Sequence, residues 1–377
     1  MGEGDLLWSV VASGPRSLLW KKATATSPAR WQNAHTIRIP FSFDLPHKSL
    51  QDQLMQKLKW GILGCGHIAE KFAKSLASVE GGELVACASR TPGKAEAFAK
   101  AVTGAKSFSD YEPLLSDLEV DAVYVATTHN FHCENVLLAL EYDKAVLCEK
   151  PLGVNADESR RMAVEAQKRK LFLMEAMWTR FLPAIQQMKH WLDEDRIGQV
   201  KVIRADFSFN KPFDAESRLY NPELAGGALL DVGIYPVSLA SFVMGTQPER
   251  VAALATFAET GVDETTLVNF GYADGAMAQL SCGITSASEN RAEIVGTKGR
   301  IILPDGFHGA TNVELCLKDA HQEKLRLPYV DSEGFRFEIE AVHQALREGK
   351  RESSIMPVSE SVAIAVTMDR ILHSLKG

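Results

Sequence analysis

Residues 59–69, with the sequence KWGILGCGHIA, join a short apolar run to a glycine turn and the start of a helical pattern. In this order Gly64 can make a tight turn, and Gly66 lets the backbone approach a pyrophosphate. Ala69 is small enough for the helix to pack on the strand. The free N–H groups and the positive dipole end of the helix then favour phosphate. The segment predicts a parallel α/β domain that binds a dinucleotide.

The next apolar run, residues 84–88, indicates which dinucleotide is bound. It ends about 20 residues after the glycine motif, where NAD-binding proteins place an acid for the ribose 2′-hydroxyl. This chain has Ser89 and Arg90 instead. A hydroxyl and a guanidinium suit a 2′-phosphate, which a carboxylate would repel. The pair favours NADP(H), with NAD as the second choice; the alternative is that Arg90 is a solvated loop charge.

Composition limits the partners of the chain. At 377 residues and 46% hydrophobic residues, it can bury a large core in about two domains. Its net charge of −7 predicts neither nucleic acid nor an anionic membrane as a partner. No uninterrupted apolar run reaches about 18 residues, so we expect no membrane span. The six cysteines are scattered without the spacing of disulfides or zinc ligands, which favours reduced thiols, no metal and a cytoplasmic location.

Residues 1–56 differ from the rest of the chain because they show no sustained period of two or 3.6 residues. Their basic bias resembles an organellar transit peptide, but Glu3 and Asp5 argue against one. We expect a disordered or accessory extension, with organellar targeting and a surface-packed arm as alternatives. The folded core should begin near residue 57.

From residue 57 to 180, strand and helix patterns alternate, which predicts a doubly wound parallel sheet with helices on both faces. The strands are nearly continuous apolar runs, as sheets covered on both faces require. We expect strands at 59–63, 84–88, 121–126, 145–148 and 171–174, and helices at 67–79, 92–102, 110–117, 132–142 and 156–169.

Residues 181–350 have a different pattern and predict an α+β domain. A helix over 180–195 leads into longer strands, and turns such as Ala273-Asp274-Gly275 mark antiparallel hairpins. A helix over 335–348 ends this domain, and residues 351–377 add a helix, 358–375, that packs back on the body. The expected strands are 200–210, 251–259, 264–272 and 276–284.

Polar residues gather where two strands of the parallel sheet end, which is where such sheets bind ligands. Residues 127–132 (TTHNFH) follow one strand, and Glu149-Lys150-Pro151 follows the next. A lysine between a glutamate and a rigid proline is held more firmly than most surface lysines. On its own, the pattern also fits an exposed lysine at a strand end.

Three motifs together resemble the Gfo/Idh/MocA oxidoreductase family: residues 64–69 (GCGHIA), 149–151 (EKP) and 226–235 (GGALLDVGIY). Their order and spacing match the family, and the resemblance covers roughly residues 57–377. Other stretches resemble the branch of dimeric dihydrodiol dehydrogenases, which is also described as an NADP-dependent D-xylose dehydrogenase. These stretches are residues 145–154, 171–183, 226–235, 259–263 and 296–299.

The resemblance implies a Rossmann domain followed by a domain on an open, mainly antiparallel sheet, whose exposed face commonly forms the oligomer interface, here of a homodimer. It also implies that Lys150 lies near the nicotinamide C4 and the reacting hydroxyl. Many members carry Asp-x-x-x-His where this chain has Asp231 and Tyr235. Spacing of i, i+4 keeps both on one helical face. Tyrosine at this position is typical of the sugar- and diol-oxidising branches; otherwise Tyr235 is a core aromatic with a satisfied hydroxyl.

We therefore predict an oxidoreductase that transfers a hydride between a secondary or anomeric alcohol, of a sugar or a trans-dihydrodiol, and NADP. Tyr235 takes the hydroxyl proton, while Lys150 lowers its pKa or binds the developing alkoxide. With Asp231, these two residues form the expected catalytic set. The expected cofactor-binding residues are Gly64, Gly66, His67, Ile68, Ser89, Arg90, Thr127, Asn130, His132, Glu149 and Lys150.

The branch further implies an aromatic-rich substrate pocket, for which we expect Trp178, Arg180 and Phe181. Alternatively, these three residues are packing at a helix start. His129 is a weaker candidate, since it has no metal-like partner. Two other functions stay open, a cofactor-binding sensor or regulator without catalysis and a structural partner that retains the fold. The intact Lys150, Asp231 and Tyr235 favour the enzyme.

Overall fold

Six short, apolar strands form the first sheet of the computed structural model, which describes residues 57–375 except 103, 305 and 331–333. The expectations for residues 1–56 lie outside the described residues. All neighbouring strands of this sheet are parallel, in the order β3-β2-β1-β4-β5-β6. The strands are β1 (Leu58–Leu63), β2 (Gly82–Ala88), β3 (Lys106–Phe108), β4 (Ala122–Val125), β5 (Ala145–Glu149) and β6 (Leu173–Ala176).

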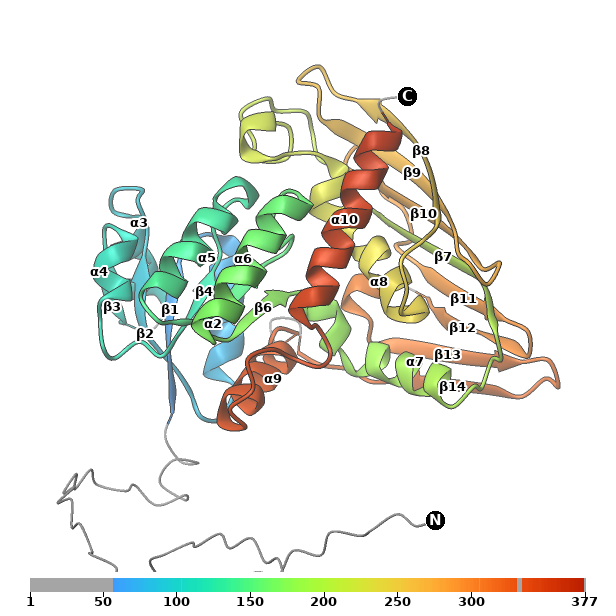
Figure 1. Ribbon diagram of the computed structural model, residues 1–377, viewed down its shortest axis with the longest axis horizontal. Helices are drawn as coiled ribbons and strands as arrows, with labels where there is room; N and C mark the ends of the chain where they lie inside the picture. The colour runs from blue at the N-terminus through green and yellow to red at the C-terminus, as the bar shows by residue number, and fades with distance from the viewer. Residues whose placement is uncertain (1–56, 103, 305, 331–333, 376–377) are drawn as a thin grey trace, which may run out of the picture. The chain divides into compact units, whose positions relative to one another are not determined.

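Helices cover both faces of this sheet (Figure 1). Alternation along β4 shows the two faces: Tyr124 packs in the core with Phe72 of α2, whereas Val123 and Val125 pack with Val136 of α5. The strand order reverses between β1 and β4, and ligands of doubly wound sheets bind at such a point. The predicted Rossmann architecture is confirmed. Its helices are α2 (His67–Ala77), α3 (Lys94–Val102), α4 (Tyr111–Leu115), α5 (His132–Glu141) and α6 (Ala156–Arg169).

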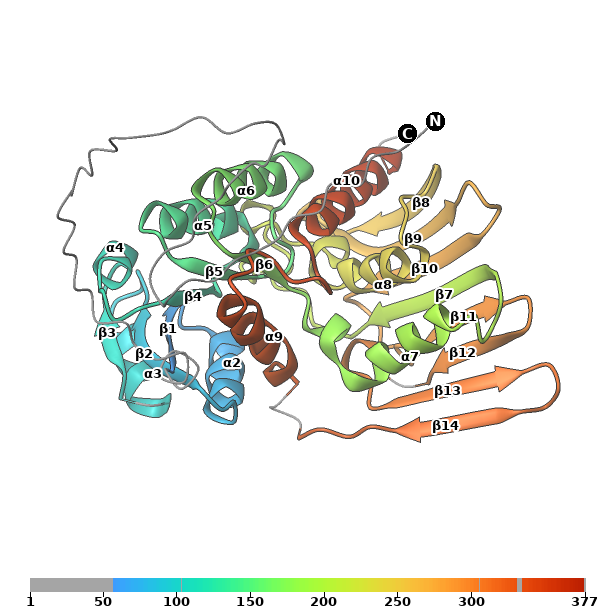
Figure 2. The ribbon, with the colours of Figure 1, turned by 60° about the horizontal axis from the view of Figure 1, so that its bottom comes forward.

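The second sheet has eight strands in the order β14-β13-β12-β11-β7-β10-β9-β8 (Figure 2). The hairpin predicted at Ala273–Gly275 joins β9 and β10, and Gly275 supplies the positive φ of 83° that the turn needs. One pairing differs from a pure hairpin arrangement, because β7 and β10 run parallel. The strands are β7 (Val200–Ser208), β8 (Arg250–Phe257), β9 (Asp263–Gly271), β10 (Met277–Gly283), β11 (Ala292–Gly296), β12 (Gly299–Leu303), β13 (Asn312–Leu317) and β14 (Gln322–Arg326).

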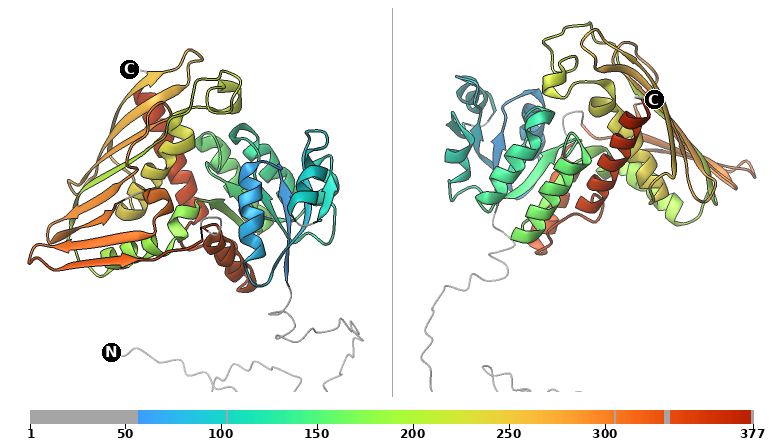
Figure 3. Two further views of the ribbon diagram at one scale, coloured as in Figure 1. Left: turned by 180° about the vertical axis from the view of Figure 1, so that it is seen from behind. Right: turned by 45° about the horizontal axis from the view of Figure 1, so that its top comes forward.

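Helices lie against one face of the second sheet and leave the other face open (Figure 3). Helix α7 (Pro183–Asp193) packs on β13, and α8 (Ile234–Met244) packs on β7 and β10. Helix α10 (Val358–Ser374) contacts both α6 of the first domain and β8 of the second, while α9 (Arg336–Arg347) packs on α2. The sheet is therefore mixed but mainly antiparallel and open, as predicted.

The helix expected over residues 180–195 starts later than predicted. Residues Trp178–Phe181 form a 3₁₀ turn, and Pro183 then begins α7 at the first helical position. Proline favours that position because its missing N–H has no partner there in any case.

A π-helical turn, Leu229–Gly233, precedes α8 and carries Asp231. Asp263 at the start of β9 holds this turn, since its Oδ2 accepts hydrogen bonds from the Leu229 N–H at 2.8 Å and the Thr266 hydroxyl at 2.7 Å. Gly227 has a φ of 117°, and a side chain there would collide with the Asp263 carboxylate. This contact explains Gly227, the second glycine of the 226–235 motif, whereas a side chain on Gly226 would collide with the Leu219 carbonyl oxygen.

One helical stretch of the described residues, Pro222–Met244, is long and apolar enough to cross a membrane by composition. However, 78% of its most apolar window is buried inside the protein. Asp231 interrupts the stretch, so a search for unbroken apolar runs does not find it. The stretch is therefore a buried core segment of the second domain.

Candidate active site

The glycine turn after β1 is built for a close approach to phosphate. Gly64 has a φ of 96°, and a Cβ there would lie 2.8 Å from the Ala126 carbonyl oxygen. Gly66 is the N-cap of α2, and a Cβ placed on it would meet no atom within 4 Å. Behind this open space, the side chain of His67 is 80% exposed and Ile68 packs against the core. Unpaired N–H groups at the start of α2 fit a pyrophosphate at this point.

Ser89 and Arg90 lie just beyond the end of β2. The buried Ser89 hydroxyl accepts a hydrogen bond from the Thr91 N–H at 3.2 Å. Arg90 lies over the ring of Tyr111, 4.6 Å from its centroid. Its guanidinium contacts Asp110 at 3.1 Å and Glu134 at 3.2 Å, and 47% of the side chain is exposed. Arg90 is therefore a held, solvent-accessible cation and not a loose loop charge.

The segment after β4 forms a hydrogen-bonded turn. The Asn135 amide donates to the Thr127 hydroxyl at 3.1 Å, and the Thr128 hydroxyl donates to Asn130 Oδ1 at 2.8 Å. His132 is fully buried, with Nδ1 2.7 Å from the Pro151 carbonyl oxygen and Nε2 3.2 Å from that of Thr127. His132 thus links the ends of β4 and β5.

Burial lowers the pKa of His132 to about 4, so its ring is neutral near pH 7. A neutral imidazole has a single N–H, and the shorter distance assigns it to Nδ1. The ring therefore donates to the Pro151 carbonyl.

Glu149, the last residue of β5, and Lys150 after it belong to a buried cluster of polar side chains. The Tyr124 hydroxyl donates to Glu149 Oε1, and Glu149 Oε2 accepts the backbone N–H of Lys150 at 3.2 Å. The Lys150 ammonium lies 2.7 Å from the Asp231 carbonyl oxygen and 3.3 Å from Asp231 Oδ1. It also lies 5.1 Å from the ring centroid of Tyr235. The structure therefore brings the three predicted catalytic residues together, with Asp231 and Tyr235 both facing Lys150.

Side chains from three segments surround the Asp231 carboxylate, and two of them are cations. Besides Lys150, Arg218 Nη1 lies 2.9 Å from Asp231 Oδ1, and His129 Nε2 lies 3.8 Å from the same oxygen. Burial alone would raise the pKa of Asp231, but Lys150 and Arg218 hold it well below its usual value. Burial lowers the pKa of His129 to about 3, with Lys150 adding to the effect. Asp231 is thus a carboxylate, and His129 beside it is neutral.

Lys150 and Tyr235 influence each other's protonation. Burial by itself lowers the pKa of Lys150, but Tyr235 and Asp231 outweigh it and raise the net value, so Lys150 stays charged. Burial raises the pKa of the Tyr235 hydroxyl above its usual value, and Lys150 acts in the opposite direction. Lys150 thus lowers the pKa of Tyr235, as the predicted mechanism requires, although burial raises that pKa by more.

Aromatic rings surround the Tyr235 hydroxyl. The indole N–H of Trp178 donates to it at 3.2 Å, and Trp178 stacks on Phe335 with centroids 5.3 Å apart. Phe207 meets the Tyr235 ring edge-on at 5.1 Å and stacks on His308 at 3.9 Å. Burial lowers the pKa of His308 to about 4. Tyr235 therefore has a satisfied hydroxyl and also faces the charged Lys150, unlike an ordinary core tyrosine.

Arg180 and Phe181 take the packing alternative and not the pocket role. The buried Arg180 guanidinium donates to Ser238 at 2.9 Å and pairs with Glu360 at 2.8 Å, which ties the 3₁₀ turn to α8 and α10. Phe181 is 4% exposed and lies in the hydrophobic core. Of the three expected pocket residues, Trp178 alone contacts Tyr235 among the described contacts.

Sequence reasoning missed Arg218, Phe207 and His308. Arg218 lies in a loop without a regular pattern, and Phe207 sits near the end of a strand where an aromatic is unremarkable. His308 comes from a 3₁₀ turn, Phe307–Gly309, far along the chain. Within the described residues, no group of three or more His, Cys, Asp or Glu side chains is arranged to hold a metal ion.

Two family models match the chain. Residues 58–177 match an oxidoreductase family with an NAD-binding Rossmann fold (GFO_IDH_MocA), and residues 185–302 match the GFO/IDH/MocA C-terminal domain. Trans-1,2-dihydrobenzene-1,2-diol dehydrogenase of Bos taurus is 37% identical over 328 residues, and that of Homo sapiens is 38% identical over 328 residues. Each alignment covers 84% of this chain and 97% of the relative.

A solved structure has the same architecture. A 3-ketoreductase from Actinomadura kijaniata, in complex with NADP and TDP-benzene, superimposes with a TM-score of 0.77 at 29% identity. The match covers 85% of this chain and 98% of that one.

We predict that NADP(H) binds at least about tenfold more tightly than NAD(H), a difference of about 1.4 kcal/mol. Arg90→Ala should shrink this ratio, because the 2′-phosphate loses its cation. The measurement is a fluorescence titration of both reduced cofactors. Arg160→Ala is the control, since Arg160 is an exposed arginine on α6 that pairs with Asp157. Equal dissociation constants for the two cofactors in the unmodified protein would contradict the assignment.

Proposed function

The chain belongs to the GFO/IDH/MocA family of oxidoreductases, and we propose that it is an NADP-dependent dehydrogenase acting on a secondary or anomeric alcohol of a sugar or a trans-dihydrodiol. The observation that carries this proposal is the contact of the Lys150 ammonium with both Asp231 and the face of Tyr235. It lies at the carboxyl end of β5, on the edge of the parallel sheet where a dinucleotide binds.

The residues divide the chemistry between them. The nicotinamide, when bound, supplies the site that accepts or donates the hydride. Tyr235 exchanges the hydroxyl proton of the substrate, and the indole N–H of Trp178, which donates to its oxygen, stabilises the phenolate. Lys150 favours the same anion by its charge. Asp231 and Arg218 set the position of Lys150, because the shared carboxylate holds both cations in one place.

The surroundings of Tyr235 favour a substrate with an apolar ring and adjacent hydroxyls. The partly buried Trp178 and Phe207 offer aromatic faces, and Arg218 offers a half-exposed guanidinium beside Asp231. Aromatic faces pack on the C–H faces of sugars and on cyclic diols alike. The diol dehydrogenase relatives support the trans-dihydrodiol, and D-xylose is the sugar that we propose alongside it.

An assay on the full chain separates this enzyme from a cofactor-binding regulator. Purified protein is mixed with NADP⁺ and pentoses, hexoses or trans-dihydrodiols, and formation of NADPH is followed by absorbance. We expect turnover with D-xylose or a trans-dihydrodiol. Tight NADP(H) binding without turnover of any substrate would favour the regulator.

We predict that Tyr235→Phe lowers kcat by roughly 10² to 10⁴, the range of general acid–base catalysis, with little change in NADP(H) affinity. Because burial holds the pKa of Tyr235 above its usual value of about 10, alcohol oxidation should rise with pH through the neutral and mildly alkaline range. The measurement is kcat/KM as a function of pH. In Tyr235→Phe the residual rate should lose this dependence, and an undiminished kcat would assign the proton transfer to another group.

Lys150→Met tests whether the two residues act as one unit. It should also lower kcat, since the cation that favours the phenolate is lost. If both groups serve one proton transfer, the double variant should be little worse than the poorer single variant. Rate losses that simply multiply would indicate independent roles.

We also propose that the open face of the second sheet forms a homodimer interface. Leu254 and Leu267 lie directly opposite each other on β8 and β9, with 75% and 51% of each exposed. Met277 on β10 is 55% exposed. An even number of residues separates it from the residue of β10 that pairs with Leu267, so its side chain lies on the same face of the sheet. Clustered apolar side chains on an uncovered sheet are typical of a protein interface.

Leu267→Asp should convert the dimer to a monomer, because a charge at the centre of an apolar interface is costly. Molar mass by light scattering at several concentrations measures the effect. Leu118→Asp is the matched control, since Leu118 is 95% exposed and precedes β4 in the first domain. An unmodified chain that is monomeric at high concentration would contradict the proposal.

We propose a reducing compartment, the cytoplasm, for the folded part. All six cysteines lie within the described residues as free thiols, and five are buried. Buried thiols of this kind suit a compartment that keeps cysteine reduced.

A further inference from the structure

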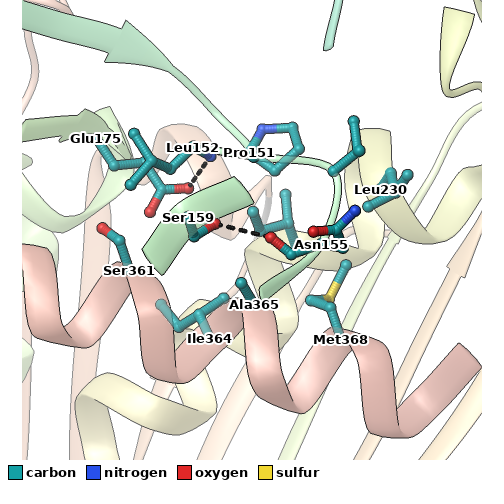
Figure 4. A pocket seen from close by; sticks show the side chains of 13 residues that line it. Pro151, Leu152, Asn155, Ser159, Glu175, Leu230, Ser361, Ile364, Ala365 and Met368 are labelled. Carbon is teal, nitrogen blue, oxygen red and sulfur yellow. Dashed lines mark hydrogen bonds between the residues drawn. The ribbon is translucent and has the colours of Figure 1, made fainter. Parts of the chain in front are cut away.

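A small cavity lies behind the segment that carries Lys150 (Figure 4). Its volume is about 10 Å³, which admits at most about one water molecule. Residues 151–155 form one wall, and the other walls come from α6, β6, the π-helical turn, the start of α8 and α10. The only acidic side chain in this lining is Glu175 of β6.

Glu175 is 1% exposed and makes one directed contact with this segment. Its Oε1 accepts the backbone N–H of Leu152 at 3.0 Å, as the dashed line in Figure 4 shows. The other oxygen, Oε2, has no hydrogen-bond partner among the described residues. Burial raises the pKa of Glu175 to about 7, although the nearby Ser361 hydroxyl, the Leu152 N–H and Arg180 lower it. Burying a carboxyl group costs free energy unless its oxygens are hydrogen-bonded. We therefore expect the one backbone N–H that Glu175 accepts to hold a segment whose position matters.

The contact belongs to a set that fixes three consecutive residues. Glu149 accepts the N–H of Lys150 at 3.2 Å, and His132 binds the carbonyl of Pro151 at 2.7 Å. Glu175 accepts the N–H of Leu152. Glu149 and His132 come from the site itself, whereas Glu175 comes from the neighbouring strand, where it pairs in register with Cys148. It contributes the anchor on the far side of Lys150.

Lys150 needs such an anchor because its ammonium reaches across to the second domain. The contact of 2.7 Å with the Asp231 carbonyl breaks if the backbone at residues 150–152 shifts by about 1 Å, and misplacement on this scale can cost about 10²-fold in rate. None of the hydrogen bonds described for Glu175 goes to Asp231 or Tyr235, so any effect on them passes through the backbone.

We propose that Glu175 is a positioning residue that holds the Lys150–Leu152 backbone, and through it the Lys150 ammonium, against Asp231 and Tyr235. This inference rests on the proposed function of Lys150.

Two substitutions separate the hydrogen bond from the volume of the side chain. Glu175→Leu fills similar space without an acceptor and leaves the Leu152 N–H unpaired. Glu175→Gln keeps an amide oxygen at the same position. Met368→Leu is the control, because Met368 lines the same cavity and no hydrogen bond is described for its side chain.

The full-length enzyme with NADP⁺ and its best substrate should show a kcat lowered roughly 10- to 100-fold by Glu175→Leu. The pKa read from the ascending limb of the kcat/KM profile should rise, because Lys150 lowers the pKa of Tyr235 and would now lie farther away. Glu175→Gln should restore most of kcat and the original profile, and Met368→Leu should leave both unchanged. If Glu175→Leu does not fold, Glu175→Asp, which withdraws the carboxylate by one methylene, should shift kcat and the profile in the same direction.

A folded Glu175→Leu or Glu175→Asp enzyme with unchanged kcat and profile would overturn the proposal. The same holds for a loss of melting temperature alone, or for a glutamine variant as impaired as the leucine variant. If the unmodified chain turns over no substrate, the proposed function fails on its own. Crystal structures of the unmodified and Glu175→Leu proteins then decide the positioning role from the distance between Lys150 Nζ and the Asp231 carbonyl.

Discussion

The buried carboxylate of Asp231 is the interaction on which the rest of the site depends. Its side chain is 7% exposed, and an unpaired charge in such a place would cost several kcal/mol. Lys150 from the parallel sheet and Arg218 from the loop before the 226–235 motif offset that cost by direct contact. Removing either cation would leave the buried carboxylate with a single cationic partner, so each of the three residues depends on the other two. This mutual dependence keeps the lysine of the cofactor domain aligned with the tyrosine of the second domain.

Each domain contributes its residues of the site through an irregular segment of backbone. Glu149 ends β5 and Lys150 follows it, and side chains from α5 and β6 hold the backbone after Lys150. In the second domain a π-helical turn carries Asp231 into α8, and Asp263 accepts the N–H at its start. π-Helical turns are rare and recur at functional sites. Regular strands and helices set the scaffold, and these two irregular segments bring the reacting groups into contact.

The sequence predicted those parts of the site whose signals are local. The turn at Gly64 and Gly66 follows from steric limits. The i, i+4 spacing predicted that Asp231 and Tyr235 share one face, and both do face Lys150 although the turn that carries Asp231 is π-helical. The environment of Arg180 could not be predicted from its neighbours in the sequence. Its neighbours Trp178 and Phe181 suggested a pocket, but its partner Glu360 lies 180 residues away and draws the guanidinium into the core. Arg218, Phe207 and His308 likewise gain their roles only from long-range packing. The parallel pairing of β7 with β10 also depends on long-range packing.

The protonation of Tyr235 reflects a balance between solvent exclusion and charge. Burial favours the neutral phenol, which can donate a proton to a developing alkoxide when a carbonyl is reduced. Alcohol oxidation needs the phenolate, which Lys150 and the Trp178 N–H favour. Glu149 opposes them, because its charge lies close enough to raise the pKa of Tyr235. In the proposed mechanism, the pH at which oxidation or reduction runs fastest therefore depends on the distance from the Lys150 ammonium to the tyrosine, so the contacts that anchor residues 150–152 would influence the chemistry.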